Sequence, residues 1–387
     1  MRINPAHRAR LESLGLSDAA DFLELPGEIV SGHPDRHVMR VQLGGTRAYL
    51  KREHRVPLAD RLTNWWAGFG MVSVSFREAA MLERLREQNV PAAAWLAAGE
   101  DAQGRAFLLL AEAAGAIDLR QHLLRLAPQQ RRERRRLAHR LGGLIAQIHN
   151  QRIEYPDLYA KHILIHPVTG ELTLLDWQRA RQLTQISWRE RCRELAALNA
   201  SIADELAGRA ERLAFLAEYL RRSGSGAPPV AAVCRLIERR MARLLKRSNV
   251  REQRLPVVAE SQPLIWLDGE AICVTLRCQA MLSASELERF AYPQSQGRNG
   301  FLQSRFVDLP DGGRARLACR RTVRRLSQVR NWVRGQRWTA PELRAGAELS
   351  RRERVGERPR LLAFGQRCRS WGVIDSFLLA DAEGRGE

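Results

Sequence analysis

Five polar residues in the first half of the chain have the side-chain types that phosphoryl transfer requires. They are Lys51, Glu78, Asp157, His162 and Asp176. The reaction needs a cation on the phosphates, acidic or other ligands for a metal ion, and a carboxylate facing the acceptor hydroxyl. Either aspartate alone would be interpreted as a turn residue, whereas the ordered set favours chemistry.

Lys51 and Glu78 fall on elements that bring them together. Alternating residues at 38–43 and 47–52 predict two strands around the turn Gly44-Gly45, and Lys51 ends the second strand. Residues 76–87 predict a helix that carries Glu78. A strand lysine held by a helix glutamate is the arrangement with which kinases contact nucleotide phosphates.

The two aspartates follow a strongly amphipathic helix, predicted from apolar residues recurring over 137–148. Asp157 lies in the irregular stretch after this helix, where kinases place the catalytic aspartate, and His162 follows five residues later, where many have a metal-binding Asn. Asp176 comes after the predicted strands 163–165 and 172–175, at the magnesium-aspartate position. Mg²⁺ prefers oxygen ligands, which fits an aspartate there.

The segment from His149 to Arg181 resembles the bacterial lipopolysaccharide core kinase family, whose members phosphorylate heptose or Kdo sugars. The family's D-x-Y-x-x-H and D-x-x-R-A motifs appear here as residues 157–162 and 176–180, and the helix sequence E-L-A-A-L at 194–198 is also similar. The resemblance covers about residues 25–250. It implies a protein-kinase-like fold, ATP with Mg²⁺, and a cytoplasmic enzyme at the inner-membrane face that acts on the lipopolysaccharide core or another phosphorylated glycolipid.

By this resemblance, Asp157 orients and deprotonates the acceptor hydroxyl, Asp176 holds Mg²⁺ with help from His162, and Lys51, positioned by Glu78, neutralises phosphate charge. Two departures stand out. Tyr155-Pro156 replaces the usual His-Arg, and the stretch 30–40, which should cover the phosphates, contains one glycine, Gly32.

The order of predicted elements indicates an α+β, protein-kinase-like two-lobe fold. We expect a kinase-like domain over 1–250, with a strand-rich N-lobe at about 25–115 and a helical C-lobe at about 116–250. Further helices are predicted at 188–222 and 229–247, joined by a surface loop at 223–229.

The last third predicts a degenerate, duplicated N-lobe at 255–387. With a shift of 267, residues 45–84 align without gaps on 312–351, with 12 identities in 40 positions, and Phe107-Leu108-Leu109 matches 377–379. In this register Lys51 falls on Ala318 and Glu78 on Ala345. We therefore expect the duplicate to bind no ATP.

The composition supports an anionic partner. The formal net charge is +20, and only three of the 63 basic residues are lysines: Lys51, Lys161 and Lys246. Because an ammonium is a compact point charge and a guanidinium a bulky fork, these lysines suggest roles that Arg does not fill. The six cysteines form no C-x-x-C pair, so neither a zinc site nor a disulfide framework is expected. No stretch predicts a membrane span.

Two other functions remain open from the residues alone. One is a catalytically weak or inactive kinase-like regulator or scaffold, and another is a small-molecule kinase of the aminoglycoside or choline type. A nucleic-acid-binding module is not expected, because aromatic residues are not interleaved with the basic ones. Trp65-Trp66 could touch a membrane or a sugar, but the matching Trp332 favours a structural role for Trp65.

Overall fold

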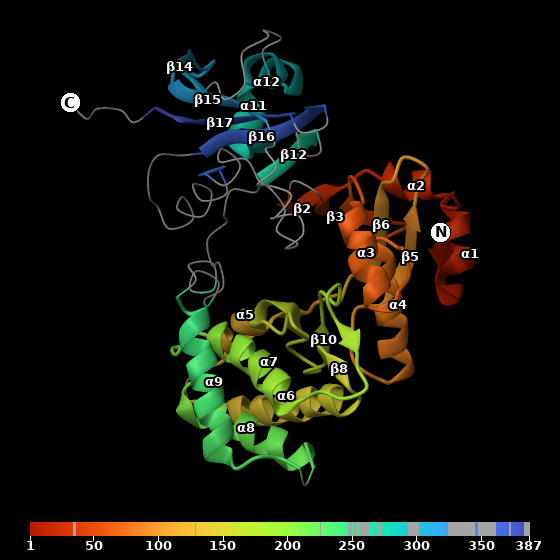
Figure 1. Ribbon diagram of the computed structural model, residues 1–387, viewed down its shortest axis with the longest axis vertical. Helices are drawn as coiled ribbons and strands as arrows, with labels where there is room; N and C mark the ends of the chain where they lie inside the picture. The colour runs from red at the N-terminus through yellow and green to blue at the C-terminus, as the bar shows by residue number, and fades with distance from the viewer. Residues whose placement is uncertain are drawn as a thin grey trace, which may run out of the picture.

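The computed structural model contains two antiparallel six-stranded sheets and, between them in the chain, a mainly helical part (Figure 1). It describes residues 1–33, 36–127, 129–224, 226–246, 250, 254, 264–268, 272–292, 302–323, 345–346, 361–370 and 373–382. The predicted mixture of helix and sheet is therefore confirmed.

The first sheet has the strand order β1-β5-β6-β4-β3-β2. The predicted hairpin is confirmed, since β3 and β4 pair from Leu43↔Thr46 to Arg36↔Glu53. The strand bounds are β1 (Arg2–Ile3), β2 (Glu28–His33), β3 (Arg36–Leu43), β4 (Thr46–Glu53), β5 (Trp95–Glu100) and β6 (Ala106–Ala111).

The two faces of this sheet belong to different cores. On one face, Leu50 and Phe107 pack with residues of the N-terminal helices, including Phe22. On the other face, Leu108 joins the core shared with α4 and the helical part. Alternation along β4 puts Lys51 on this second face, because Leu50 faces the first. The helices are α1 (Arg8–Ser13), α2 (Ala19–Leu23), α3 (Leu58–Trp66) and α4 (Val74–Glu87).

The helical part lies beneath the first sheet in Figure 1. Its longest helix, α6, buries the predicted stripe, including Leu137, Leu141 and Ile148. The two aspartates lie in loops between α6 and α7: Asp157 follows β8, and Asp176 follows β10. The bounds are β7 (Ile117–Asp118), α5 (Leu119–Arg125), α6 (Arg131–Asn150), β8 (Ile153–Glu154), η2 (Ala160–His162), β9 (Ile163–Ile165), β10 (Leu172–Leu174), β11 (Arg181–Gln182), α7 (Trp188–Ala200), α8 (Arg209–Arg222) and α9 (Val230–Leu244).

The single helix predicted over 188–222 is wrong, because the chain turns between α7 and α8. Ile202 and Leu206 are buried and continue the apolar pattern through the turn. The periodicity of apolar residues therefore did not reveal the turn. The Arg212 guanidinium donates hydrogen bonds to the carbonyls of Asn199, Ile202 and Ala207. It thereby satisfies backbone groups that the helix no longer pairs.

The second sheet has its own core and the strand order β12-β13-β16-β17-β15-β14. Leu317 and Phe377 pack there against residues of two short helices, including Leu287. The bounds are β12 (Leu264–Asp268), β13 (Ile272–Thr275), α11 (Leu276–Met281), α12 (Ala284–Ala291), β14 (Leu302–Asp308), β15 (Arg314–Val323), β16 (Leu361–Ser370) and β17 (Val373–Asp381).

The two sheets share a pairing register. In the first sheet Leu50 of β4 lies opposite Leu109 of β6, and in the second Leu317 of β15 lies opposite Leu379 of β17. These are the residues that the two sequence alignments match. The repeat positions Asn331, Trp332, Gly335, Ala347 and Leu349 lie outside the described residues.

The neighbouring strand pair repeats the same irregularity. Ala97 of β5 lies opposite Leu109 after a register shift that begins at Trp95, and Ala363 of β16 lies opposite Leu379 after a shift that begins at Leu361. A β-bulge adds one unpaired residue and changes the direction of the strand. A register shift at the equivalent position of both sheets is therefore a specific similarity between them.

Candidate active site

Lys51 and Glu78 form the ion pair that the sequence predicted. Lys51 Nζ donates to Glu78 Oε1 at 2.7 Å and to Oε2 at 2.9 Å, and the Glu78 side chain is only 2% exposed. The backbone N–H of Trp177 also donates to Glu78 Oε1, at 3.2 Å. One carboxylate on α4 thus fixes both the lysine on β4 and the segment that follows Asp176.

Asp176 lies between two cationic or titratable groups. Its Oδ1 is 3.6 Å from Lys51 Nζ, and its Oδ2 is 3.6 Å from His162 Nε2. Burial by itself raises the pKa of Asp176, but Lys51 and His162 outweigh this and hold the pKa below its usual value. The backbone of Asp176 has φ of 64°, a left-handed conformation that aspartate tolerates better than most residues.

His162 is held by the loop that carries Asp157. Its Nδ1 lies 2.8 Å from the Asp157 carbonyl oxygen, and because a carbonyl only accepts, Nδ1 carries the proton. Burial lowers the pKa of His162. With Nδ1 engaged in this way, the ring directs Nε2 towards Asp176 Oδ2.

The two carboxylate oxygens of Asp157 differ in their hydrogen bonds. Oδ1 accepts a hydrogen bond from Arg179 Nη1 at 2.9 Å, whereas Oδ2 is buried and receives no hydrogen bond from the described residues. Burial raises the pKa of Asp157, and Arg179 opposes that rise. A buried acceptor without a donor is costly, so a donor brought by a ligand would be favoured here.

Tyr155 replaces the usual histidine of the catalytic loop and ties the loop in another way. Its ring stacks on Trp177 with centroids 4.1 Å apart, and its hydroxyl donates to the carbonyl of Leu175. Its backbone N–H donates to Glu194 Oε2 at 3.0 Å, and the same oxygen lies 3.0 Å from His149 Nε2. The loop with Asp157 is thereby attached to the segment with Asp176.

Sequence reasoning missed two cations of the site. Arg179 is the arginine of the D-x-x-R-A motif, but the sequence does not predict its contact with Asp157. Lys161 stands out because lysine is rare in this chain, but its rarity does not predict where the side chain lies. It is half-buried, and burial lowers its pKa, while the charges of Asp176 and Asp157 oppose that shift. The lysine count was the available signal for Lys161.

The fit to Mg²⁺ depends mainly on Asp176. No group of three or more His, Cys, Asp or Glu side chains suited to a metal occurs in the described part of the chain. Mg²⁺ commonly takes only one or two protein carboxylates and completes its shell with water and substrate phosphates. Asp176, whose lowered pKa keeps it ionised, meets this requirement, with His162 beside it.

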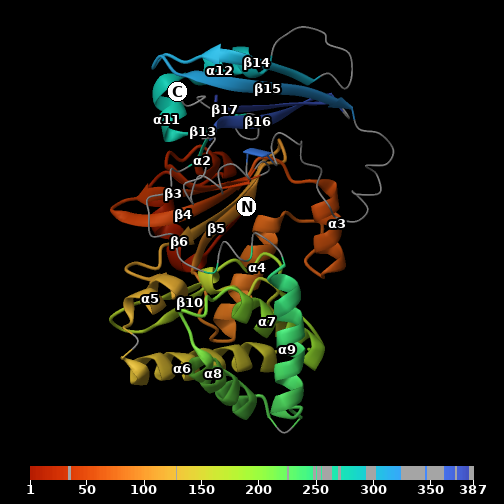
Figure 2. The same cartoon turned by 90° about the vertical axis from the view of Figure 1, so that its left-hand side faces the viewer.

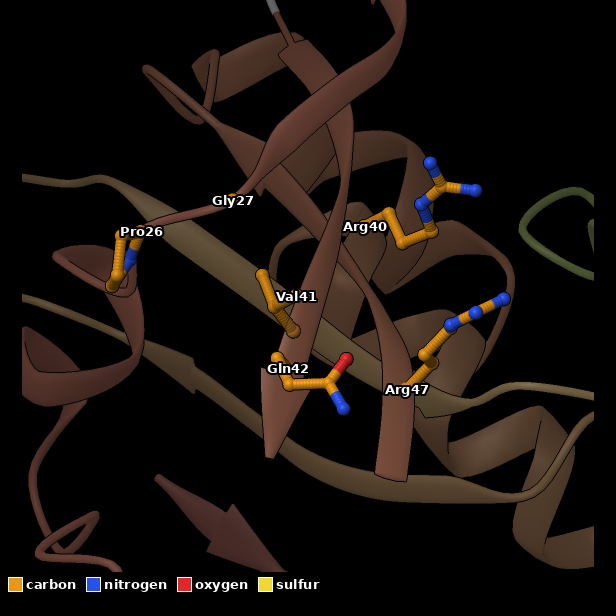
Figure 3. A pocket seen from close by; sticks show the side chains of 6 residues that line it. All are labelled: Pro26, Gly27, Arg40, Val41, Gln42 and Arg47. Atoms are coloured by element: carbon orange, nitrogen blue, oxygen red, sulfur yellow. The ribbon is translucent and has the colours of Figure 1, made fainter. Parts of the chain in front are cut away.

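A separate pocket of about 390 Å³ lies on the first sheet, lined by Pro26, Gly27, Arg40, Val41, Gln42 and Arg47 (Figure 3). A side chain at position 27 would clash, because an added Cβ would lie 2.5 Å from the Arg40 carbonyl oxygen. Arg47 is four residues before Lys51 on β4, roughly 13 Å along the strand. None of the five predicted site residues lines this pocket.

The lysine–glutamate pair, the two aspartates and the strand-then-helix order together are the features of a protein-kinase-like phosphotransferase. A model of the lipopolysaccharide kinase (Kdo/WaaP) family matches residues 20–219, more than half of the 387 residues. The chain therefore belongs to the lipopolysaccharide kinase (Kdo/WaaP) family.

Two similar proteins carry the name WaaP. The chain is 26% identical over 212 residues to the lipopolysaccharide core heptose(I) kinase WaaP of Pseudomonas aeruginosa, a match that covers 51% of this chain and 78% of the relative. A solved structure of WaaP in complex with acyl carrier protein is 22% identical, with a TM-score of 0.47, over 63% of this chain and 99% of that one. By its family the protein is a kinase acting on the lipopolysaccharide core.

Proposed function

We propose that the protein transfers the γ-phosphoryl group of ATP to a heptose or Kdo hydroxyl of the lipopolysaccharide core. The observation that carries this proposal is the free oxygen of Asp157 within a site that also holds Lys51, Glu78 and Asp176. A general base needs one carboxylate oxygen that can accept the hydrogen bond of the acceptor hydroxyl. Arg179 bonds only Oδ1, and Oδ2, although buried, has no donor among the described residues.

Each of the other side chains has a role set by its contacts. Lys51 neutralises charge on the α- and β-phosphates, and Glu78 keeps its ammonium in place. Asp176, with His162 beside it, holds Mg²⁺, which supplies charge neutralisation to the phosphates when bound. Asp157 orients the acceptor hydroxyl and takes its proton from Oδ2.

The retained loop geometry favours an active kinase over the regulator or scaffold considered above. The hydroxyl of Tyr155 links its loop to Leu175, one residue before Asp176. The substitution of Tyr155-Pro156 for His-Arg therefore comes with a replacement contact, which an inactive fold would have no need to keep.

We further propose the division predicted from the sequence, a kinase domain over 1–250 and a degenerate second N-lobe over 255–387. The shared register of Leu50 and Leu317, and the bulges at Trp95 and Leu361, support it. Ala318 and Ala345 stand where the ion pair would be, so the second unit serves structure or docking.

No described helix has the length and apolar character needed to cross a membrane. Because lipopolysaccharide core is built on a lipid anchor, we propose that the enzyme works peripherally at the cytoplasmic face of the inner membrane.

The test is mass spectrometry of core oligosaccharide from a strain lacking the gene, complemented with the wild type or with Asp157→Asn. We expect a loss of one phosphate that only the wild type restores. A core with unchanged phosphate would refute the proposed function, and the purified protein with ATP and the dephosphorylated core would identify the acceptor sugar.

A further inference from the structure

Helix α3 and the turn after it expose an apolar stripe. It consists of Leu58 (59% exposed), Leu62 (37%), Trp65 (56%), Trp66 (82%) and Met71 (45%). The first four are spaced i, i+4, i+7 and i+8, which places them on one side of a helix. Trp65, for which the sequence favoured a structural role, is therefore a surface residue.

Polar contacts, not apolar packing, attach α3 to the protein. Asn64 is 1% exposed, and its side-chain amide donates to the Val72 carbonyl at 2.8 Å. Arg61 donates to the Met71 carbonyl at 3.0 Å and to Glu100 Oε2 at 2.7 Å. With its polar residues turned inward, the helix presents its apolar side outward. Figure 2 shows α3 at the margin of the molecule.

Exposed arginines flank the stripe at both ends. Arg55 precedes α3, and Arg84 of α4 lies over the ring of Phe69, just after α3, at 5.0 Å from the ring centroid. The acidic residue of α3 itself is Asp60, in the first turn, where it complements the helix dipole. The net charge of +20 adds a long-range attraction to anionic surfaces.

A short chain of hydrogen bonds connects the stripe to the active site. Arg77 donates to Asn64 Oδ1 at 3.1 Å and to the Ala180 carbonyl at 3.1 Å. Ala180 directly follows Arg179, which holds Asp157. The apolar stripe and the residue proposed to meet the acceptor are thus fixed to one framework.

We propose that this stripe inserts into the surface of an anionic lipid bilayer and so turns the active site towards a membrane-anchored acceptor. Tryptophan favours the interface between headgroups and acyl chains, and flanking arginines pair with anionic headgroups. A convex helix of nine residues offers little area for a stable protein interface, whereas each side chain can enter a bilayer separately. The role of the stripe in turning the active site towards the acceptor rests on the proposed function, but the binding of the stripe to a bilayer does not.

The test is co-sedimentation of the full chain with vesicles, without nucleotide or acceptor. The wild type should bind vesicles containing phosphatidylglycerol more tightly than vesicles of phosphatidylcholine alone. The double variant Trp65→Ser/Trp66→Ser should lose about tenfold in affinity per tryptophan removed. Brominated lipids should quench tryptophan fluorescence of the wild type and quench the double variant much less.

Phe306→Ser is the matched control, because Phe306 is an aromatic residue of the second sheet with 57% exposure. It should bind vesicles as the wild type does. The proposal would be overturned if the double variant bound vesicles as tightly as the wild type, or if the wild type did not bind them. It would also be overturned if the stripe bound an acidic protein partner instead of a bilayer. If vesicle binding follows the stripe but core phosphate does not depend on the gene, the proposed function alone fails.

Discussion

The first and second sheets pair their strands in the same way but differ in the residues that carry charge. Leu50 and Leu317 are both buried against a leucine of the neighbouring strand, whereas Lys51 in one sheet is Ala318 in the other. Packing residues are retained where burial of apolar area stabilises the sheet. A charged pair has no such use in a sheet that binds no phosphate, which is what we predict for the second sheet. On that prediction, the comparison separates the residues that build the sheet from those that make it catalytic.

The largest effect should come from the aspartates, which the second unit does not duplicate. Asp157→Asn removes the base and Asp176→Asn removes the proposed metal ligand, so each should lower kcat ~10²–10⁴-fold in a purified phosphotransfer assay. Asp308→Asn, on the exposed end of β14, is the control and should leave kcat unchanged. Activity close to wild type in either active-site variant would sink the assignment.

The next effect concerns the position at which the two sheets differ, Lys51 against Ala318. Lys51→Arg should be nearly as damaging as Lys51→Ala, with losses on the order of 10²-fold in kcat/KM for ATP. The Lys51 side chain is only 17% exposed and meets both Glu78 oxygens, so a guanidinium fork does not fit in its place. Lys246→Arg serves as the control. Retention of most ATP affinity by Lys51→Arg would show that Lys51 is not the phosphate lysine.

A smaller effect tests the electrostatics around Asp157. A general base acts when ionised, so activity falls as the pH drops through its pKa. Arg179 lowers the pKa of Asp157 against the larger effect of burial, so Arg179→Gln should raise that pKa further. The acidic limb of the kcat profile should therefore move to higher pH, while the neighbouring variant Arg181→Gln should leave it in place. An unmoved limb in Arg179→Gln would mean that Asp157 does not control it.

The smallest expected effect is the absence of a second ATP-binding site. Calorimetry of the full chain should detect one Mg²⁺-dependent ATP site, and Lys51→Ala should remove it without uncovering another. In the sequence alignment Ala318 and Ala345 stand at the positions of Lys51 and Glu78, and residues 255–387 contain no lysine to replace them. Micromolar ATP binding that persists in Lys51→Ala would argue for two nucleotide sites. It would contradict the difference that we infer between the first and second sheets.

The sequence alone was sufficient for the strands around Gly44-Gly45 and the helix α4. It also picked out five residues that the structure brings close together, and their roles in the reaction stay a prediction. Strand alternation and helical periodicity are local properties, and each site residue adjoined a local pattern. The same method failed over 188–222, where the apolar pattern ran on through a turn that Arg212 stabilises from α8. Periodicity reports which residues are buried and not whether the backbone between them stays helical.

By itself the sequence determined which side chains could do chemistry and that Lys161 was unusual, and it predicted that the last third repeats the first sheet's pattern. Only the tertiary structure decided that the Tyr155 hydroxyl bonds the carbonyl of Leu175, that Arg179 pairs with just one oxygen of Asp157, and that Trp65 is exposed. These outcomes depend on contacts between elements distant in the chain. Such contacts are set by how the elements pack together, which neither composition nor spacing encodes residue by residue.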